Sequence, residues 1–166
     1  MSHSMADRVR TLSRVLSVII AVLVFVGDQL TKAMVERFIP DQAVIPIIPH
    51  FFNLTHTRNA GAAFGLFSQS PSPGKTVLLI VVSLALLAAV VWMVIRSRQF
   101  QWETSVGLAF ILGGALSNLF DRIRVGSVVD FLDFYINGYH WPAFNLADSA
   151  IVVGAAFLIF SVVFSE

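Results

Sequence analysis

Four long apolar segments constrain the fold of this chain more than any other feature. The second of them, Val77 to Ile95, contains a single polar residue, Ser83. A helix of this length spans about 28 Å at roughly 1.5 Å per residue, close to a bilayer core of about 30 Å. Backbone groups that face lipid must be hydrogen-bonded within their own segment, so each segment is predicted to be a transmembrane helix. The segments are Leu12 to Leu30, Val77 to Ile95, Thr104 to Phe120 and Phe144 to Phe164, the last helix itself covering residues 146–164.

The composition is that of an integral membrane protein. Of the 166 residues, 57% are hydrophobic and only 13% are charged, whereas charged residues make up about a quarter of a soluble domain. We expect the whole chain, 1–166, to form one membrane domain. The sequence has no cysteine, which excludes a thiol nucleophile, a disulfide and a cysteine-ligated metal. A net charge of +1, without a basic patch interleaved with aromatic residues, gives no indication of nucleic-acid binding.

The arginines indicate how the chain is oriented in the membrane. Arg8, Arg10 and Arg14 flank the start of the first segment, and Arg96 and Arg98 lie in the short link between the second and third. Lysine and arginine collect on the cytoplasmic side, so both chain ends, including a tail over residues 1–10, are predicted to be cytoplasmic. The alternative, that the first segment is a cleaved signal peptide, is disfavoured because no small-residue cleavage site follows it.

Two longer pieces are predicted on the opposite, outer face. Residues 43–57 are rich in β-branched and aromatic side chains and are interrupted by prolines, which favours short strands. Residues 59–65 are punctuated by glycine, which predicts a turn that brings the backbone close to a ligand. We expect residues 38–67 to form a small sheet whose 59–64 edge overhangs the site and is more mobile than the helices. Residues 122–141 mix acidic with aromatic and aliphatic side chains suited to the membrane interface.

Two aspartates at the outer ends of apolar regions are the best candidates for catalysis. Asp130 and Asp148 are separated by enough residues for an excursion that returns to the same face. Two carboxylates in a partly dry site do not both ionise easily, so they share a proton and can act as base and acid, as in aspartic proteases. Blander alternatives stay open here. Asp148, three residues after Asn145, has the position of the acidic half of a helix cap, and Asp130 that of a solvated loop carboxylate.

Other polar residues stand at similar boundaries between apolar and polar sequence. Asn118, near the end of an apolar helix, needs a hydrogen-bond partner, either on a neighbouring helix or on a substrate backbone. Arg122 either snorkels to the interface or holds a phosphate or carbonyl of a lipid-bearing substrate. Asp28 and Lys32 form an i, i+4 pair, for which the simplest interpretation is a salt bridge at a helix end. The four histidines lack the spacing of metal ligands.

Four sequence boxes follow one another along the apolar segments. The longest are Gly113-Gly-Ala-Leu-Ser-Asn-Leu-Phe-Asp-Arg-x-x-x-Gly-x-Val-Val-Asp-Phe131 and Phe144-Asn-Leu-Ala-Asp-Ser149. Two shorter boxes precede them, Asp28-Gln-x-Thr-Lys32 and Asn59-x-Gly-Ala-Ala-Phe64. In content and order these boxes resemble those of the bacterial lipoprotein signal peptidases, type II. Ser117 is a departure, because glycine is expected before the asparagine in that family.

The resemblance implies a fold, an activity and a set of site residues. The implied fold is an all-α membrane protein with a small β element: a four-transmembrane-helix bundle with an extracytoplasmic β-cradle and a short interfacial helix. The implied activity is that of an aspartic endopeptidase of the bacterial inner membrane. It cleaves prolipoproteins on the N-terminal side of a diacylglyceryl-modified cysteine, near the periplasmic face. Asp130 and Asp148 match the catalytic pair, and the matched substrate-binding positions are Asn118, Arg122, Asn145, Asn59 and Asp28.

The resemblance also implies the partners. These are diacylglyceryl-prolipoprotein substrates and membrane lipids, with no metal or organic cofactor, and we expect the chain to act as a monomer.

Two rival functions fit parts of the sequence. A small membrane transport or structural subunit would use the carboxylates for ion transfer or assembly, but it would more naturally place them at mid-membrane. A metal-dependent membrane hydrolase would use Asp121, Asp130 and Asp133 as oxygen ligands for a divalent cation. Activity that persists in a chelator would exclude a requirement for a readily removable metal.

Overall fold

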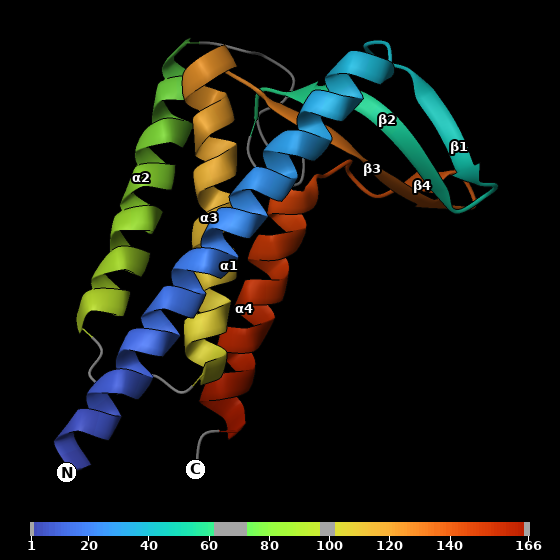
Figure 1. Cartoon of the computed structure of the whole chain (residues 1–166). Helices are drawn as coiled ribbons and strands as arrows, with labels where there is room; N and C mark the ends of the chain where they lie inside the picture. The colour runs from blue at the N-terminus through green and yellow to red at the C-terminus, as the bar shows by residue number, and fades with distance from the viewer. Residues whose placement is uncertain (1, 62–72, 97–101, 165–166) are drawn as a thin grey trace.

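The protein is a helical bundle with a small sheet at one end. A computed structural model describes residues 2–61, 73–96 and 102–164. Within these ranges the elements are α1 (Ser2–Phe38), β1 (Val44–Ile48), β2 (Phe52–Asn59), α2 (Pro73–Arg96), α3 (Trp102–Val125), β3 (Val128–Ile136), β4 (Tyr139–His140) and α4 (Leu146–Phe164). The strands project sideways from one end of the bundle, and α1 begins and α4 ends at the other (Figure 1). Four apolar helices with a small β element are the fold class that the sequence predicts.

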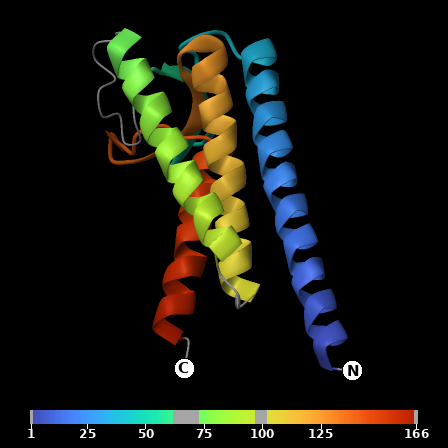
Figure 2. The same ribbon diagram turned by 90° about the vertical axis from the view of Figure 1, so that its left-hand side faces the viewer.

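Each helix is long and apolar enough to cross a membrane. The qualifying stretches are Thr11–Phe38, Gly74–Met93, Trp102–Val125 and Leu146–Phe164. Half of the most apolar window of α3 is buried inside the protein, against 6% of that of α2. Figure 2 accordingly shows α3 between α1 and α2. The central helix, α3, therefore carries the polar residues Asn118 and Arg122 into contact with its neighbours, while α2 is left to face lipid.

Glycines on α3 allow its backbone to contact the backbone of a neighbouring helix directly. A Cβ added to Gly107 would lie 2.7 Å from the carbonyl oxygen of Gly154, and a Cβ on Gly114 would collide with the carbonyl oxygen of Ala147. Small residues at helix crossings permit this kind of packing in membranes. The Gly114 contact holds the first turn of α4, which contains Asp148, directly against α3.

The end of α3 directs the chain into the sheet. Gly126 has a φ of 77°, and its N–H donates to the carbonyl oxygen of Arg122 over 3.0 Å, as in a left-handed C-cap. Arg122 and Arg124 occupy the last turn, where positive charge complements the helix dipole. The cap puts Asp130 in β3 shortly after the end of α3.

The four strands form an antiparallel meander in the order β1-β2-β3-β4. The predicted strands of residues 43–57 are present as β1 and most of β2, and Pro46 lies in the edge strand β1, where a missing N–H is tolerated. The strands β3 and β4 are elements that sequence reasoning missed. They are joined by Asn137 and Gly138, both with positive φ, 51° and 80°, which suits the tightest hairpin turns.

The sheet packs on the last turns of α1. Val35 and Ile39 form a buried cluster with Val129 and Phe131, and the Nδ1–H of His56 in β2 donates to the Ile39 carbonyl oxygen over 2.8 Å. This packing explains why α1 continues to Phe38 rather than ending near the predicted Leu30. The outer end of α1 is thus the support on which the sheet rests.

Two expectations concern residues outside the description. A short interfacial helix is not among the elements of the described ranges, and half of the predicted 59–64 edge falls in residues 62–72, which are not described. The part that is described begins a turn, because the Gly61 N–H donates to Asn59 Oδ1 over 2.9 Å. The overhanging edge and its mobility remain predictions.

Candidate active site

The first turn of α4 forms a reciprocal cap. Asn145 Oδ1 accepts the Asp148 N–H over 2.9 Å, and Asp148 Oδ2 receives the Asn145 N–H at 3.4 Å. This is the arrangement of a capping box, which sequence reasoning weighed as an alternative to catalysis for Asp148. The structure makes the two roles compatible, because the cap uses only Oδ2, whereas Oδ1 has a different partner, Asn118.

Asp130 reaches the same place from the sheet. It lies in β3 opposite Thr57 of β2, and only 3% of its surface is exposed. Its Oδ2 accepts a hydrogen bond from Asn59 Nδ2 over 2.9 Å, and its Oδ1 accepts one from Asn145 Nδ2 over 2.7 Å. Asp130 is therefore a buried carboxylate held by two amides, not the solvated loop residue of the alternative interpretation.

Asn145 connects the two aspartates. Its amide nitrogen donates to Asp130, and its amide oxygen accepts from the backbone of Asp148. Asn118 of α3 completes the cluster, since its Nδ2 donates to Asp148 Oδ1 over 2.8 Å. The structure thus brings together Asp130, Asp148, Asn118 and Asn145 from three separate elements at the junction of bundle and sheet, as the sequence predicts.

Burial sets the acidity of Asp130. The pKa of Asp130 is raised from its ordinary value to about 7, first by loss of solvent and then by the negative charge of Asp148, against the opposing hydrogen bonds of Asn59 and Asn145 and the charge of Lys32. A carboxyl group with this pKa exchanges its proton near neutral pH. Such a group is suited to general acid–base chemistry.

Arg122 has a buried hydrogen-bond donor beside the cluster that has no partner in the described part of the chain. Its two terminal nitrogens donate to the carbonyl oxygens of Asn118 and Gly61, over 3.3 and 3.1 Å. Its Nε is buried and has no hydrogen-bond partner among the described residues. A buried donor without a partner is costly, and an incoming carbonyl oxygen would satisfy it. Arg122 and Asn59 are both partly exposed, as residues that touch a substrate must be.

Asp28 does not have the exposure that a substrate contact requires. Its side chain is fully buried and lies 2.6 Å from Lys32 Nζ. Its Oδ2 accepts from Ser117 Oγ over 2.7 Å, and its Oδ1 accepts the Ala147 N–H over 2.8 Å. Asp28 thus caps α4 from another helix; its contact with substrate, which would need this side chain to become exposed, stays a prediction. Asn145, with 0% exposure, and Asn118, with 6%, also support the aspartates from within the protein.

The three aspartates of the metal-site alternative have separate partners. Asp121 receives Lys32 Nζ and Gln29 Nε2, whereas Asp133 receives Asn53 Nδ2 and lies 2.8 Å from His140 Nδ1. Within the described ranges there is no group of three or more His, Asp or Glu residues arranged to hold a metal ion. Asp121, Asp130 and Asp133 therefore do not make one ligand set.

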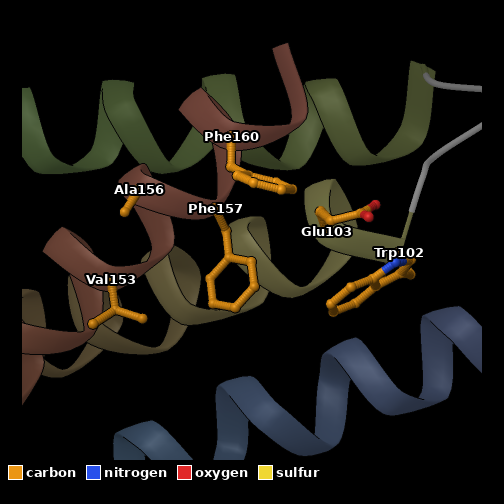
Figure 3. Close-up of a pocket in the computed structure, with 6 residues that line it drawn as sticks. All are labelled: Trp102, Glu103, Val153, Ala156, Phe157 and Phe160. Atoms are coloured by element: carbon orange, nitrogen blue, oxygen red, sulfur yellow. The ribbon is translucent and has the colours of Figure 1, made fainter. Parts of the chain in front are cut away.

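An apolar groove lies at the far end of the bundle from this cluster. It has a volume of about 480 Å³ and is formed where α3 begins and α4 approaches its end (Figure 3). Phe157 and Phe160 of α4 and Trp102 of α3 line it, with Glu103 as its acidic residue. None of the predicted site residues borders it, so the groove is separate from the aspartate cluster.

Comparison with known proteins agrees with the geometry. Residues 20–164 match a family model described as signal peptidase (SPase) II. A lipoprotein signal peptidase from Desulforapulum autotrophicum is 46% identical over 89% of this chain and 91% of its own, and one from Syntrophus aciditrophicus is 42% identical over 87% and 90%. A bacterial membrane enzyme whose structure was solved by the in meso method at 2.3 Å resolution superposes with a TM-score of 0.80 at 36% identity, over 89% of this chain and 87% of that one.

The matched range contains every residue of the cluster, from Asp28 to Asp148. It also contains most of each of the four helices long enough to cross a membrane. This chain is therefore a multi-pass membrane protein and belongs to the signal peptidase II family of proteases.

Proposed function

We propose that this chain is an aspartic endopeptidase whose catalytic pair is Asp130 and Asp148. The observation that carries the proposal is the amide of Asn145, which hydrogen-bonds the Asp130 carboxylate while its own oxygen fixes the backbone of Asp148. A buried carboxylate from a strand and a partly buried one from a helix thereby share one hydrogen-bonded cluster. Their mutual repulsion contributes to the raised pKa of Asp130, as a proton-sharing pair requires.

In the proposed starting state, Asp130 holds the shared proton and Asp148 is ionised. Asp148 takes a proton from water, the resulting oxygen attacks the scissile carbonyl carbon, and the carbonyl oxygen takes the proton from Asp130. The C–N bond then breaks as the leaving nitrogen takes the proton from Asp148, and a hydroxyl proton of the intermediate returns to Asp130. Arg122 Nε is the donor best suited to hold a substrate carbonyl, together with the partly exposed Asn59.

The substrates are diacylglyceryl-modified prolipoproteins, cleaved on the N-terminal side of the lipidated cysteine. The relatives named lipoprotein signal peptidase support this substrate class. The cluster lies at the membrane boundary, where a lipid-anchored cysteine and an extended peptide can both reach it. No metal or organic cofactor takes part, the chain forms one domain, and it acts as a monomer in contact with membrane lipids.

The location is the bacterial inner membrane, with both termini in the cytoplasm. The arginines near the start of α1 and between α2 and α3 support this orientation. The sheet and the catalytic pair are at the opposite end of the bundle from the start of α1 (Figure 1), so cleavage takes place near the periplasmic face.

The test is cleavage by the purified chain in detergent, followed by the shift of the product on a gel. We expect cleavage of a diacylglyceryl-modified prolipoprotein, unchanged by a chelator, and none of the same precursor without its lipid. Equal cleavage of both precursors would refute the substrate class. Loss of activity on chelation would refute a metal-free aspartic mechanism.

A further inference from the structure

A buried lysine lies directly behind the aspartate cluster. Lys32 of α1 is 3% exposed, and its ammonium contacts three acceptors. Two are the carboxylates of Asp28 and Asp121, each 2.6 Å from Nζ, and the third is Asn118 Oδ1 at 2.8 Å. Three acceptors match the three donors of an ammonium group. A helix-end salt bridge with Asp28 alone, as the sequence predicts, does not account for the bond to Asn118.

The bond to Asn118 decides which way that amide points. An ammonium can only donate, so the atom of Asn118 that faces Lys32 must be the carbonyl oxygen. The amide NH₂ is then turned toward Asp148 Oδ1, to which it donates over 2.8 Å. Asn145 Nδ2 donates to the same Asn118 oxygen over a longer 3.3 Å, so Lys32, at 2.8 Å and with a full positive charge, is the stronger of the two donors that hold this orientation.

We propose that Lys32 is a positioning residue for the catalytic pair: its ammonium fixes the orientation of Asn118, which in turn holds the carboxylate of Asp148. The inference deepens the proposed function and rests on it. It does not require Lys32 to touch the substrate, and its burial prevents such contact.

The charged groups around the pair come from every element packed against it. Arg122 faces it from α3, with Asp121 acting on Arg122 in the same helix, Lys32 faces it from α1, and the two aspartates face each other from β3 and α4. Of these, Lys32 lowers the pKa of Asp130 and Asp148 raises it. Removal of the ammonium would therefore move the Asp130 titration to higher pH.

A small polar cavity lies on the other side of Lys32. It has a volume of about 80 Å³ and is lined by Lys32 and Asp121 together with Gln29, Glu36 and Arg124. A polar cavity of this size has room for water, which would reduce the cost of keeping the lysine charged. Arg124 borders the same cavity with a half-exposed side chain, so it offers a matched control for the loss of a nearby cation.

The test compares Lys32→Met with Arg124→Met. For Lys32→Met we expect kcat to fall on the order of a hundredfold, as when a preorganised electrostatic contact is removed. We expect KM to stay nearly constant and the pH–rate profile to move to higher pH. Arg124→Met should leave kcat and the profile as they are. If Lys32 only ties the helices together, folded Lys32→Met enzyme will keep the original kcat and profile, and the inference is wrong.

If Lys32→Met does not fold, a second variant can test the same proposal. The double variant Lys32→Met with Asp121→Asn removes the ion pair without leaving Asp121 as an uncompensated buried charge. The proposal expects this protein to lose kcat with KM nearly constant, because Asn118 is no longer held. A folded double variant with normal kcat would overturn it.

A spectroscopic titration separates this inference from the proposed function. Difference infrared spectra against Asp130→Asn report the protonated carboxyl of Asp130 without any substrate. A midpoint that rises in Lys32→Met but not in Arg124→Met supports the role of Lys32, even if no prolipoprotein is cleaved. An unchanged midpoint contradicts that role, whereas absent cleavage by the unmodified chain contradicts only the proposed function.

Discussion

At the scale of single residues, two side chains of the site each take part both in the cap of α4 and in the aspartate cluster. Asp148 belongs to a capping box and also accepts from Asn118, so a helix cap and a catalytic carboxylate are not exclusive interpretations. Asn145 is both the capping residue and the link to Asp130. The sequence spacing of Asn145 and Asp148 predicts the cap directly. By contrast, the contact of Asp28 with the Ala147 N–H joins residues too far apart in the chain for any local pattern to reveal it.

The pKa of Asp130 predicts how stability depends on pH. Its folded-state pKa of about 7 lies above its ordinary value, so the folded protein binds more protons than the unfolded chain between about pH 4 and pH 7. The free energy of unfolding should therefore decrease as pH rises through this window, by up to a few kcal/mol at roughly 1.4 kcal/mol per pKa unit. Thermal unfolding in detergent measures the effect.

Asp130→Asn is the comparison for this measurement. Asparagine keeps the shape of the side chain but does not titrate, so its unfolding temperature should be less dependent on pH in the same window and higher than that of the unmodified chain at pH 8. An identical pH dependence in both proteins would show that Asp130 has an ordinary pKa.

At the scale of elements, the sequence predicts helices and strands that have regular local patterns, but not those that depend on packing between segments far apart in the chain. The apolar segments predict the helices, and prolines in residues 43–57 predict a strand suited to a sheet edge. The strand β3 was missed because its burial comes from α1 and β2, on which Val129 and Phe131 pack. Asn137-Gly138 was a usable signal, since this dipeptide between β-forming residues favours a hairpin. The continuation of α1 beyond Leu30 likewise depends on its packing against the sheet, whose strands are distant in sequence and cannot be predicted from the residues of α1 alone.

The contact between α3 and the start of α4 can be tested with one methyl group. In Gly114→Ala the new Cβ would collide with the backbone carbonyl of Ala147, which cannot rotate away. We expect a loss of stability of about 1–3 kcal/mol, typical of overpacking, and reduced cleavage because Asp148 moves with the helix. Gly74→Ala is the control, because nothing lies within 4 Å of a Cβ at that position. Equal unfolding temperatures for the two variants would exclude a tight α3–α4 crossing.

At the scale of the whole molecule, the candidate site lies where the helical bundle meets the sheet. The bundle contributes Asp148 and Asn118, the sheet contributes Asp130 and Asn59, and Asn145 connects them. The outer turns of α1 support the sheet through Val35 and Ile39 and so fix the sheet relative to the bundle. Sequence boxes predict which residues belong to the site, whereas the roles of Lys32, Ser117 and Asp28 as its inner support follow only from the folded arrangement.

The proposed orientation can be tested because the chain has no cysteine. A single cysteine in place of Asn137, in the β3–β4 turn, should react with a membrane-impermeant maleimide in intact spheroplasts. A cysteine in place of the exposed Arg8 near the start of α1 should react only after lysis. The reverse pattern would place the sheet in the cytoplasm.

The most direct test of the catalytic pair is the activity of Asp148→Asn on a diacylglyceryl-modified prolipoprotein. Asparagine keeps one amide oxygen that can accept the Asn145 N–H in the capping box, so we expect the variant to fold. It cannot accept a proton from water, and we expect cleavage to fall by about a hundred- to ten-thousand-fold or more. Asp130→Asn should behave alike, while Asp133→Asn, whose carboxylate binds Asn53 and His140, should retain more activity than either. Near-normal cleavage by folded Asp148→Asn would contradict the aspartic mechanism.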